Sequence, residues 1–282
     1  MSRYIILYNP KSNNKHGKSA AQGAASLISG EEHEFVDWLS ITDKQRFFDA
    51  LKEDDKVILC GGDGSINHLI NEVDTDTITN EVYFYATGTG NDFVLSIGKK
   101  PGTLILLNKY FIGLPTVTVN GKDYKFINGV GFGIDGYCCE VGDDLKQKSD
   151  KPINYSSIAI KGILFHFKPV NAVVTVDGKV ERFKKVWLAP TMYGTCYGGG
   201  MFPTPEQKRG RGRVSAMVYY GKGKLRSLMA FPSIFTGEHV SRTDMVRILT
   251  GKNVKVRFDR PTPLQIDGET IRNVTEYTVS FK

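Results

Sequence analysis

The sequence has few cysteines and histidines and contains no long apolar run. Its four cysteines form no Cys-x-x-Cys pair, and its five histidines include no closely spaced metal-binding pair. Buried, reduced thiols are therefore expected rather than a metal or redox site. No apolar stretch approaches the ~20 residues needed to cross a bilayer, and the N-terminal apolar run is only YIILY. We expect a cytoplasmic protein without a signal peptide.

The composition is that of a folded chain with an uneven distribution of charge. With 282 residues, 40% of them hydrophobic, the chain can form one large domain or two ordinary ones. Residues 1–100 hold 10 Lys and Arg against 15 Asp and Glu, a net charge of −5, whereas residues 101–282 carry +12. This step suggests two domains with different partners, the basic one facing nucleic acid, an anionic membrane or a phosphorylated ligand. The densest basic cluster is Lys208, Arg209, Arg211 and Arg213.

The N-terminal part of the chain alternates strand-like and helix-like segments. The strand-like segments are residues 3–9, 33–39, 56–60 and 82–86, and the helix-like segments are residues 17–28, 43–52 and 65–73. Thr42 is the expected N-cap of the second helix. Because parallel strands need crossover connections, the alternation predicts an α/β domain in which a doubly wound parallel sheet carries helices on both faces.

After Pro101 the pattern changes to alternating runs broken by Asn-Gly and Asp-Gly, which are strong hairpin signals. The expected strands lie in residues 116–129, 172–190, 213–221, 253–259, 263–271 and 277–281, and the expected helices in residues 153–167 and 224–237. This predicts an antiparallel, β-rich second domain. We place the domains at 1–112 and 113–282, with the last strand returning toward the first domain.

Three glycine- and hydroxyl-rich loops follow strands of the predicted parallel sheet. They are NPKSNNKHGK at 9–18, GGDGS at 61–65 and TGTGND at 87–92. Ligands of open parallel sheets bind beyond the carboxyl ends of the strands, and glycines let backbone N–H groups converge on an anion. Hydroxyls and charge come from Ser12, Ser65, Thr89, Lys11 and Lys18. The three loops together predict a phosphate-rich ligand, hence a nucleotide.

Asp63, between the glycines of GGDGS, does not suit a loop that binds only phosphate, because its carboxylate would repel the anion. A divalent cation held between them, or a proton taken from a nucleophile, would remove the conflict. The alternative is that Asp63 caps the following helix. We interpret GGDG as a phosphoryl-transfer loop.

Two other motifs are rejected. Residues 131–136, GFGIDG, fit G-x-G-x-x-G, but the following EVGDDLKQKSDKP is charged and then contains proline. It is not expected to form the helix leading to a second strand that a dinucleotide fingerprint requires. Residues 17–19, GKS, have the end of a Walker P-loop, but Ser12 occupies the position of its first glycine.

The motifs, in this order, resemble those of the diacylglycerol kinase catalytic-domain family, which includes soluble bacterial lipid kinases and sphingosine kinases. The family patterns N-P-x-S-G, G-G-D-G-T-x-N-E and P-x-G-T-G-N-D-F match residues 9–13, 61–68 and 86–93. In the second domain, N-x-x-G-x-G-x-D matches residues 128–135, and D-G-E matches residues 267–269. The likeness spans nearly the whole chain.

The resemblance implies a kinase that binds ATP with Mg²⁺ on the N-terminal loops and a lipid between its domains. The implied nucleotide contacts are Asn9, Pro10, Lys11, Ser12, Asn13, Ser40, Gly61, Gly62, Gly64, Ser65, Ile66, Asn67 and Thr89. Gly133 and Asp135 would meet the lipid headgroup. Glu269 resembles the general base, with Asp267 beside it, while Asp63 is an alternative base or a ligand of the magnesium that accompanies ATP. A membrane-bound acceptor would require docking of the basic domain on an anionic surface, and no nucleic-acid partner is expected.

Three departures from the family pattern affect these expectations. Ser65 keeps the hydroxyl of the usual threonine, whereas His68 replaces a glutamate. Soluble bacterial members resemble P-D-A-x-x-D-D-G-x-L-D where this chain has residues 205–215, PEQKRGRGRVS. Because the acids are lost, we expect no structural metal in residues 206–215, with Arg211 or Arg213 supplying the positive charge instead. A NAD kinase-like enzyme and a non-catalytic nucleotide-binding regulator remain the alternatives.

Overall fold

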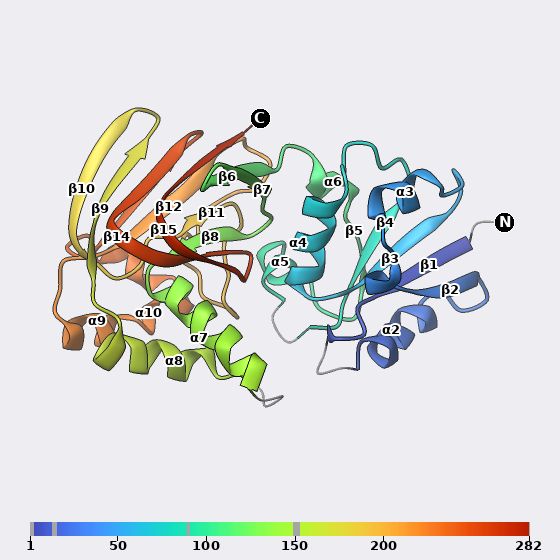
Figure 1. Cartoon of the computed structure of the whole chain (residues 1–282), viewed down its shortest axis with the longest axis horizontal. Coiled ribbons are helices and arrows are strands. Elements are labelled where there is room, and N and C mark those ends of the chain that lie inside the picture. The colour runs from blue at the N-terminus through green and yellow to red at the C-terminus, as the bar shows by residue number, and fades with distance from the viewer. Residues whose placement is uncertain (1–2, 13–15, 89–90, 149–152, 282) are drawn as a thin grey trace. The chain divides into compact units, whose positions relative to one another are not determined.

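The computed structural model describes residues 3–12, 16–88, 91–148 and 153–281. The chain divides into two compact units, Met1–Leu114 and Pro115–Lys282 (Figure 1). We refer to them as unit 1 and unit 2. The boundary between the units lies after Leu114, two residues beyond the predicted boundary after residue 112. No helix in the described ranges is both long enough and apolar enough to span a membrane.

Unit 1 contains a mainly parallel sheet with the strand order β2-β1-β3-β4-β5. The strands are β1 (Arg3–Tyr8), β2 (Glu32–Asp37), β3 (Lys56–Gly61), β4 (Val82–Ala86) and β5 (Leu104–Leu106). The first four are parallel, as predicted, whereas β5 runs antiparallel to β4. The connection from β4 to β5 contains the five-residue helix α5 (Asp92–Ser96). A helix of this length rises only ~7.5 Å, too little to return the chain to the far end of the sheet.

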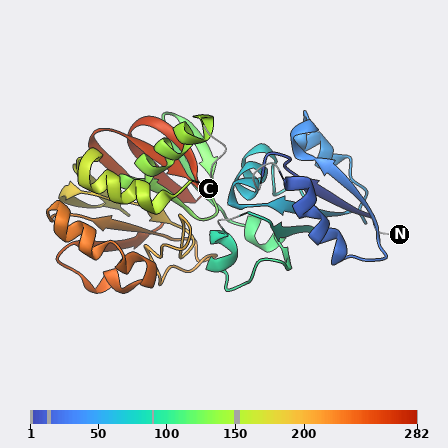
Figure 2. The same ribbon diagram turned by 90° about the horizontal axis from the view of Figure 1, so that it is seen from below.

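Helices cover both faces of the unit 1 sheet (Figures 1 and 2). They include α2 (Gly17–Ser26), α3 (Lys44–Asp49), α4 (Asp63–Glu72) and α6 (Asn108–Phe111). Ala21 and Ala24 of α2 pack on Ile6 and Ile58. Because strand side chains alternate between faces, their neighbours in β1 and β3 point to the opposite side, where α4 packs on β3.

Helix α3 begins one residue later than the sequence suggested. Its N-cap is Asp43, whose carboxylate accepts the Arg46 N–H at 3.0 Å. The prediction of Thr42 as the N-cap was therefore wrong. Both residue types are good caps, and the carboxylate gains in addition from its position at the positive end of the helix dipole.

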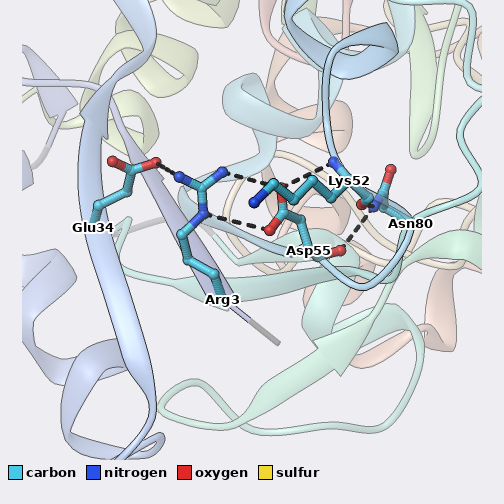
Figure 3. A network of polar contacts seen from close by, with 5 residues as sticks. All are labelled: Arg3, Glu34, Lys52, Asp55 and Asn80. Atoms are coloured by element: carbon cyan, nitrogen blue, oxygen red, sulfur yellow. Dashed lines mark hydrogen bonds and ion pairs between the residues drawn. The ribbon is translucent and has the colours of Figure 1, made fainter. Parts of the chain in front are cut away.

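At the amino ends of the strands, an ion-pair network joins β1, β2 and the loop before β3 (Figure 3). The Arg3 guanidinium contacts Asp55 at 3.0 Å and Glu34 at 3.1 Å, and Asn80 Nδ2 donates to the backbone oxygens of Lys52 and Asp55. Burial acts to raise the pKa of Asp55, but Arg3 and the Lys52 amide outweigh it and lower that pKa. At this edge, the charged side chains of Arg3, Glu34 and Asp55 pair with one another.

Unit 2 is built on an antiparallel ten-stranded sheet. Its strands are β6 (Pro115–Val119), β7 (Lys122–Lys125), β8 (Gly129–Phe132), β9 (Val170–Val176), β10 (Lys179–Val186), β11 (Thr191–Met192), β12 (Val214–Tyr219), β13 (Val246–Gly251), β14 (Val254–Ile266) and β15 (Glu269–Phe281). The long β14 pairs with β8, β9 and β15, and β15 continues onto β6.

The hairpin turns of unit 2 lie at the predicted Asn-Gly and Asp-Gly positions. Asn120, Asp177 and Asp267 each have positive φ, as does the glycine that follows each of them. Two successive residues with positive φ are the requirement of a type I′ turn, whose twist matches that of the flanking strands.

Helices pack against one side of the unit 2 sheet (Figure 1). They are α7 (Ile134–Lys148), α8 (Tyr155–Lys161), a π-helix (Gly162–His166), α9 (Lys224–Ala230) and α10 (Ser233–Thr236). The last four were predicted, but α7 was not, because residues 140–152 were expected not to form a helix. Beneath the helices lies a core that includes Ile163, Phe167, Trp187 and Met217.

The cysteines are all free thiols, and three of the four are buried. Burial raises the pKa of Cys60 to about 12, and it does the same to that of Cys139, which is half-buried. A thiol with such a pKa carries little thiolate near neutral pH. The expectation of reduced, buried thiols holds for Cys60, Cys138 and Cys196.

Candidate active site

The three predicted anion-binding loops of unit 1 follow β1, β3 and β4, which are adjacent in the sheet. Parallel neighbours end at the same edge, so the structure brings the loops together at the carboxyl edge of the sheet. Ser40, in the 3₁₀ turn Trp38–Ser40 after β2, lies at the same edge, and its Oγ donates to the Asp37 carbonyl at 2.7 Å. Asn13 and Thr89, both predicted to contact the nucleotide, lie outside the described residues.

The first loop is held by Asn9. Its Oδ1 accepts the Lys11 N–H at 2.9 Å, and its carbonyl oxygen accepts the Ser12 N–H at 3.0 Å and the Ser12 hydroxyl at 2.7 Å. Pro10 lies within this turn. A Cβ on Gly17 would lie 1.9 Å from the Asn9 oxygen, so only glycine lets α2 begin against the loop. The turn leaves the Lys11 side chain exposed to solvent.

The GGDGS loop joins β3 directly to α4. A Cβ on Gly61 would lie 1.9 Å from Ser65 Oγ, so the glycine makes room for that hydroxyl to turn back over the strand end. Gly62 is the N-cap of α4 and, as a glycine, has no side chain that could cap the helix. Glycine at the cap and Gly64 in the first turn let an anion approach the helix N-terminus, where backbone N–H groups and the helix dipole favour negative charge. Downstream, Ile66 and Asn67 are buried in the helix packing.

Asp63 binds the loop after β4 rather than the start of its own helix. Its Oδ2 accepts the Asp92 N–H and its Oδ1 the Phe93 N–H, each at 2.9 Å. These amides belong to the start of α5, so the carboxylate is the cap of α5 and not of α4. The alternative that Asp63 caps the next helix, α4, is therefore wrong. Asp63 joins the second and third anion-binding loops.

We predict that Asp63→Asn lowers the free energy of unfolding of unit 1 by about 1–3 kcal/mol, because one of the two amides loses its acceptor. Urea denaturation followed by circular dichroism measures the change. Asp43→Asn is the matched control. Asp43 accepts a single amide, and Asn caps helices as well as Asp does. Equal midpoints for the two variants would contradict the assigned role of Asp63.

The loop after β4 holds two buried polar atoms without a partner among the described residues. They are Thr87 Oγ1 and Asn91 Oδ1. At the start of this loop, the N–H groups of Thr87 and Gly88 donate to the Gly61 carbonyl at 2.8 and 3.3 Å. Buried polar atoms are nearly always paired. A hydroxyl donor and an amide oxygen fit a phosphate with its magnesium hydration shell. Sequence analysis singled out only Thr89 of TGTGND and missed both residues.

His68, which replaces a glutamate of the family pattern, lies on the solvent side of α4. Its Nδ1 is 2.7 Å from Glu72 Oε1, and Glu72 also contacts Lys44 of α3 at 3.0 Å. The side chain therefore takes part in a surface network between α3 and α4.

In unit 2, Asp267 anchors the β14–β15 turn on the segment before β8. Its carboxylate accepts the backbone N–H groups of Ile127, Asn128 and Gly129 at 2.6, 2.8 and 2.9 Å. In return, the Asp267 N–H donates to the Gly129 carbonyl at 3.0 Å. Both carboxylate oxygens are thus engaged by the backbone, and the Asp-Gly-Glu turn is held in one position.

Glu269 is the first residue of β15 and is exposed. The strand that carries it is tied to α7, because Thr270 Oγ1 donates to Asp143 Oδ2 at 2.7 Å and Arg272 pairs with Asp144 at 2.5 Å. An exposed carboxylate on a rigid turn can accept a proton from a hydroxyl that comes within hydrogen-bond distance.

Arg209, rather than Arg211 or Arg213, brings positive charge to the segment before β8, to which Asp267 also binds. Its guanidinium donates to the Ile127 carbonyl and, at 2.8 Å, to Asn128 Oδ1. It also lies 5.5 Å from the centre of the Tyr193 ring. The other two arginines are exposed. That Arg211 or Arg213 supplies positive charge in place of a metal stays a prediction, and in the structure the inward-turned arginine of this loop is Arg209.

The loop that carries Arg209 is closed by neutral side chains. Gln207 Nε2 donates to the Arg213 carbonyl at 2.8 Å, and Ser215 Oγ donates to Gln207 Oε1 at 2.6 Å. Within the described ranges no three His, Cys, Asp or Glu side chains group together as a metal site would require. The absence of a metal from residues 206–215 stays a prediction.

A buried polar cluster surrounds Asp135 in the first turn of α7. Its Oδ1 accepts the Gly136 N–H at 2.9 Å, and its Oδ2 accepts the Tyr197 hydroxyl at 3.1 Å. A Cβ on Gly131 would lie 1.6 Å from Asp135 Oδ2 and 2.5 Å from Gln265 Nε2, so that glycine leaves space for both side chains. Gln265 is buried beside the Asp135 carboxylate, whose pKa it acts to lower. Sequence analysis missed Tyr197 and Gln265, which no motif marks.

Gly133, predicted with Asp135 to meet the substrate, is required by the backbone. Its φ is +120°, and a Cβ would lie 2.5 Å from the Trp187 carbonyl oxygen. The glycine lets β8 turn into α7 while its backbone packs on the backbone of Trp187 and Leu188. This turn places Asp135 in the interior of unit 2.

Burial raises the pKa of Asp135 to about 6, although the Gly136 amide and the Tyr197 hydroxyl act to lower it. A carboxyl whose pKa is raised in the folded state contributes stability below its unfolded pKa, and this contribution is lost as the pH rises through 6. Two pH units correspond to about 3 kcal/mol. We predict that the free energy of unfolding of wild type falls by about 2 kcal/mol relative to that of Asp135→Asn between pH 4 and pH 7, because part of the full change lies below pH 4. Urea titrations of both proteins measure the difference, and parallel stability curves would contradict it.

Comparison with known proteins supports the resemblance noted in the sequence. The diacylglycerol kinase catalytic domain model matches residues 3–109, and the YegS C-terminal NAD kinase beta sandwich-like domain model matches residues 128–279. A diacylglycerol kinase of Bacillus subtilis (strain 168) is 25% identical over 228 residues, covering 78% of this chain and 73% of the relative. One of Mycobacterium tuberculosis (strain CDC 1551 / Oshkosh) is 24% identical over 271 residues, covering 91% and 85%.

Solved structures share the fold. A crystal structure of a diacylglycerol kinase from Bacillus anthracis str. Sterne matches with a TM-score of 0.63 at 17% identity, covering 99% of this chain and 93% of that one. A second crystal structure from the same organism matches with a TM-score of 0.70 at 18% identity, covering 100% and 92%. The two family models together account for both units. The chain therefore belongs to the diacylglycerol kinase catalytic-domain family, and it is a kinase with a mainly parallel α/β unit followed by an antiparallel β-rich unit.

Proposed function

We propose that this protein is an ATP-dependent lipid kinase that transfers the γ-phosphate of ATP to the hydroxyl of a diacylglycerol-like lipid. The observation that carries the proposal is the carboxyl edge of unit 1, where the three glycine- and hydroxyl-rich loops follow adjacent strands and where Thr87 Oγ1 and Asn91 Oδ1 are buried without a partner among the described residues. The family membership supports the same activity.

ATP is assigned to this edge through the loop of Asn9 to Ser12, the N-terminus of α4 at Gly62, and Thr87 and Asn91. Magnesium bound with ATP would neutralise the phosphate charge. Asp63 holds the second and third loops together through two backbone amides, and we assign it a positioning role toward the phosphates and their magnesium. The Ser12 and Ser65 hydroxyls are within these loops and are suited to phosphate oxygens.

Glu269 is assigned the role of general base. As the lipid oxygen forms its bond to the γ-phosphorus, the bond from that phosphorus to the ADP oxygen breaks, and the hydroxyl proton passes to the Glu269 carboxylate. Asp267 positions Glu269, because its own oxygens are occupied by three backbone amides. Asp135, with Tyr197 and Gln265, is assigned to the polar headgroup of the lipid.

The decisive experiment supplies γ-labelled ATP and Mg²⁺ with acceptors in detergent micelles: diacylglycerol, monoacylglycerol, sphingosine and, as a soluble alcohol, NAD. We expect label in the lipid fraction, most of it in phosphatidic acid from diacylglycerol. Label only in NADP would establish the NAD kinase alternative. ATP binding without transfer to any acceptor would establish a nucleotide-binding regulator. The Glu269→Gln variant serves as the control for contaminating kinases.

We place the protein in the cytoplasm, in peripheral contact with a membrane. The support for this is that the proposed acceptor resides in a bilayer and that residues 101–282 carry a net charge of +12. A product that is a phosphorylated lipid would belong to phospholipid synthesis.

A further inference from the structure

Unit 2 exposes a group of large apolar side chains on two adjoining helical segments. Phe165 of the π-helix is 72% exposed, and Leu225 and Met229 of α9 are 70% and 66% exposed. The segments are adjacent in Figures 1 and 2, and Lys224 Nζ at the start of α9 donates to the Leu164 carbonyl at 2.8 Å. Because the π-helix directly continues α8, we call this surface the α8–α9 face.

The local sequence explains why these side chains point to solvent. Leu225 and Met229 are four residues apart and share one side of α9, while Ser227 and Ala230 occupy the buried side. In the π-helix and the residue after it, Ile163 and Phe167 enter the core and Phe165 between them does not. These segments thus contain more large apolar side chains than are buried in the core. Exposed apolar groups of this kind commonly mark an interaction surface.

The two segments that form the α8–α9 face carry charge of one sign. Residues 155–168 and 221–236, which contain the two segments, hold five Lys and Arg and no Asp or Glu. They are Lys161, Lys168, Lys222, Lys224 and Arg226. Asp244 contacts Lys222 at 3.2 Å and Arg226 at 2.9 Å, and α7, which packs on α8 and the π-helix, carries Glu140, Asp143 and Asp144. The two segments themselves carry five cations and no acid, so their own charge is positive.

We propose that the α8–α9 face is a docking surface for an anionic lipid bilayer, into which Phe165, Leu225 and Met229 insert while the flanking lysines and Arg226 meet lipid phosphates. Apolar side chains bordered by Lys and Arg are the pattern of reversible binding at the membrane interface. The inference rests on the proposed lipid-kinase function, for which it names the membrane-facing surface.

The basic cluster at residues 208–213 fits this role less well. Arg209 is engaged inside unit 2, and residues 206–213 contain no apolar side chain that could insert into a bilayer. Lys208, Arg211 and Arg213 can add attraction to an anionic surface only by charge. We therefore assign them a lesser part in docking.

The test is co-sedimentation, without ATP, of wild type and a Phe165→Ser/Leu225→Ser/Met229→Ser variant with vesicles of equal phosphatidylcholine and phosphatidylglycerol. The lost apolar contact should weaken vesicle binding at least about tenfold. A control variant, Leu27→Ser/Ile112→Ser/Val180→Ser, changes three side chains elsewhere that are exposed by half or more and should bind as wild type does. Pure phosphatidylcholine vesicles and raised salt should also weaken wild-type binding.

A second measurement keeps the proposal testable if the triple variant fails to fold. Phe165→Trp and Val180→Trp are compared by fluorescence, each after subtraction of wild type, with vesicles containing brominated lipid. Only the first tryptophan should be quenched. Quenching of both or of neither would overturn the proposal.

Other results would also overturn the proposal. Unchanged co-sedimentation of the triple variant would show that the α8–α9 face does not bind the bilayer. Loss of vesicle binding only in Lys208→Glu/Arg211→Glu/Arg213→Glu would assign membrane docking to that basic cluster instead. A wild-type dimer that the triple variant converts to monomer, with vesicle binding intact, makes the face a subunit interface. Kinase activity in micelles is measured separately. Vesicle binding without lipid phosphorylation in micelles would sink the proposed function and leave the docking surface standing.

Discussion

Replacing Glu269 by Gln should lower kcat by about 10²–10⁴ while leaving the thermal midpoint of unfolding unchanged. Glutamine has the size of glutamate but cannot accept the proton of the attacking hydroxyl. The residue is exposed at the start of β15, so its replacement leaves the core as it is. The proton would then have to leave through water, and the transfer step slows.

The measurement is steady-state phosphorylation of diacylglycerol in micelles, with calorimetry for the midpoint. Glu276→Gln is the matched control, because Glu276 lies on the same strand, is exposed and pairs with Lys255 at 2.9 Å on the protein surface. It should turn over like wild type. Wild-type kcat in Glu269→Gln would remove this residue from the chemistry and leave the base unassigned.

The second large effect is expected from Asp267→Ala, which should lower the free energy of unfolding by about 3–5 kcal/mol. The substitution removes the acceptor of three backbone N–H groups at 2.6–2.9 Å. Hydrogen bonds to a charged acceptor are among the stronger ones, and unsatisfied donors in a partly buried site are costly. Since the turn carries Glu269, kcat should fall as well.

Asp177→Ala is the control for this prediction. Asp177 occupies the equivalent Asp-Gly turn position with positive φ and accepts the N–H groups of Lys252 and Asn253. Those contacts are exposed, so water can replace the carboxylate, and the loss should be near 1 kcal/mol. Equal destabilisation of the two variants in urea would show that turn geometry, and not the amide contacts of Asp267, accounts for the effect.

Local sequence signals predicted most of the fold. The alternation of strands and helices gave the four parallel strands of unit 1, and the Asn-Gly and Asp-Gly pairs gave the hairpins of unit 2. Helix α7 was not predicted because residues 140–152 are charged and then contain proline, and Gly136 and Gly142 lower its helix propensity further. Both glycines are needed for close packing in the folded chain. A Cβ on Gly136 would lie 2.1 Å from the Pro263 carbonyl oxygen, and a Cβ on Gly142 would lie 2.7 Å from the Tyr155 ring.

The candidate site was predicted in its location but not in the division of roles among its acids. The three loops lie at one sheet edge, as the strand order requires. What Asp63 and Asp267 bind could not be read from motifs, because their amide partners lie about 30 and 140 residues away in the sequence. Arg209 is a similar case, since its partners at residues 127 and 128 are found only in the folded chain.

The contacts of Asp63 and Asp267 have one property in common: both carboxylates bind main-chain amides. Such a contact depends on the path of the backbone and is indifferent to the side chains at residues 92, 93 and 127–129. Segment exchange with a relative should therefore tolerate many substitutions in these stretches. A one-residue insertion or deletion would instead turn the amides away from the carboxylate. The contacts of the two aspartates therefore constrain the length of these loops more than their sequence.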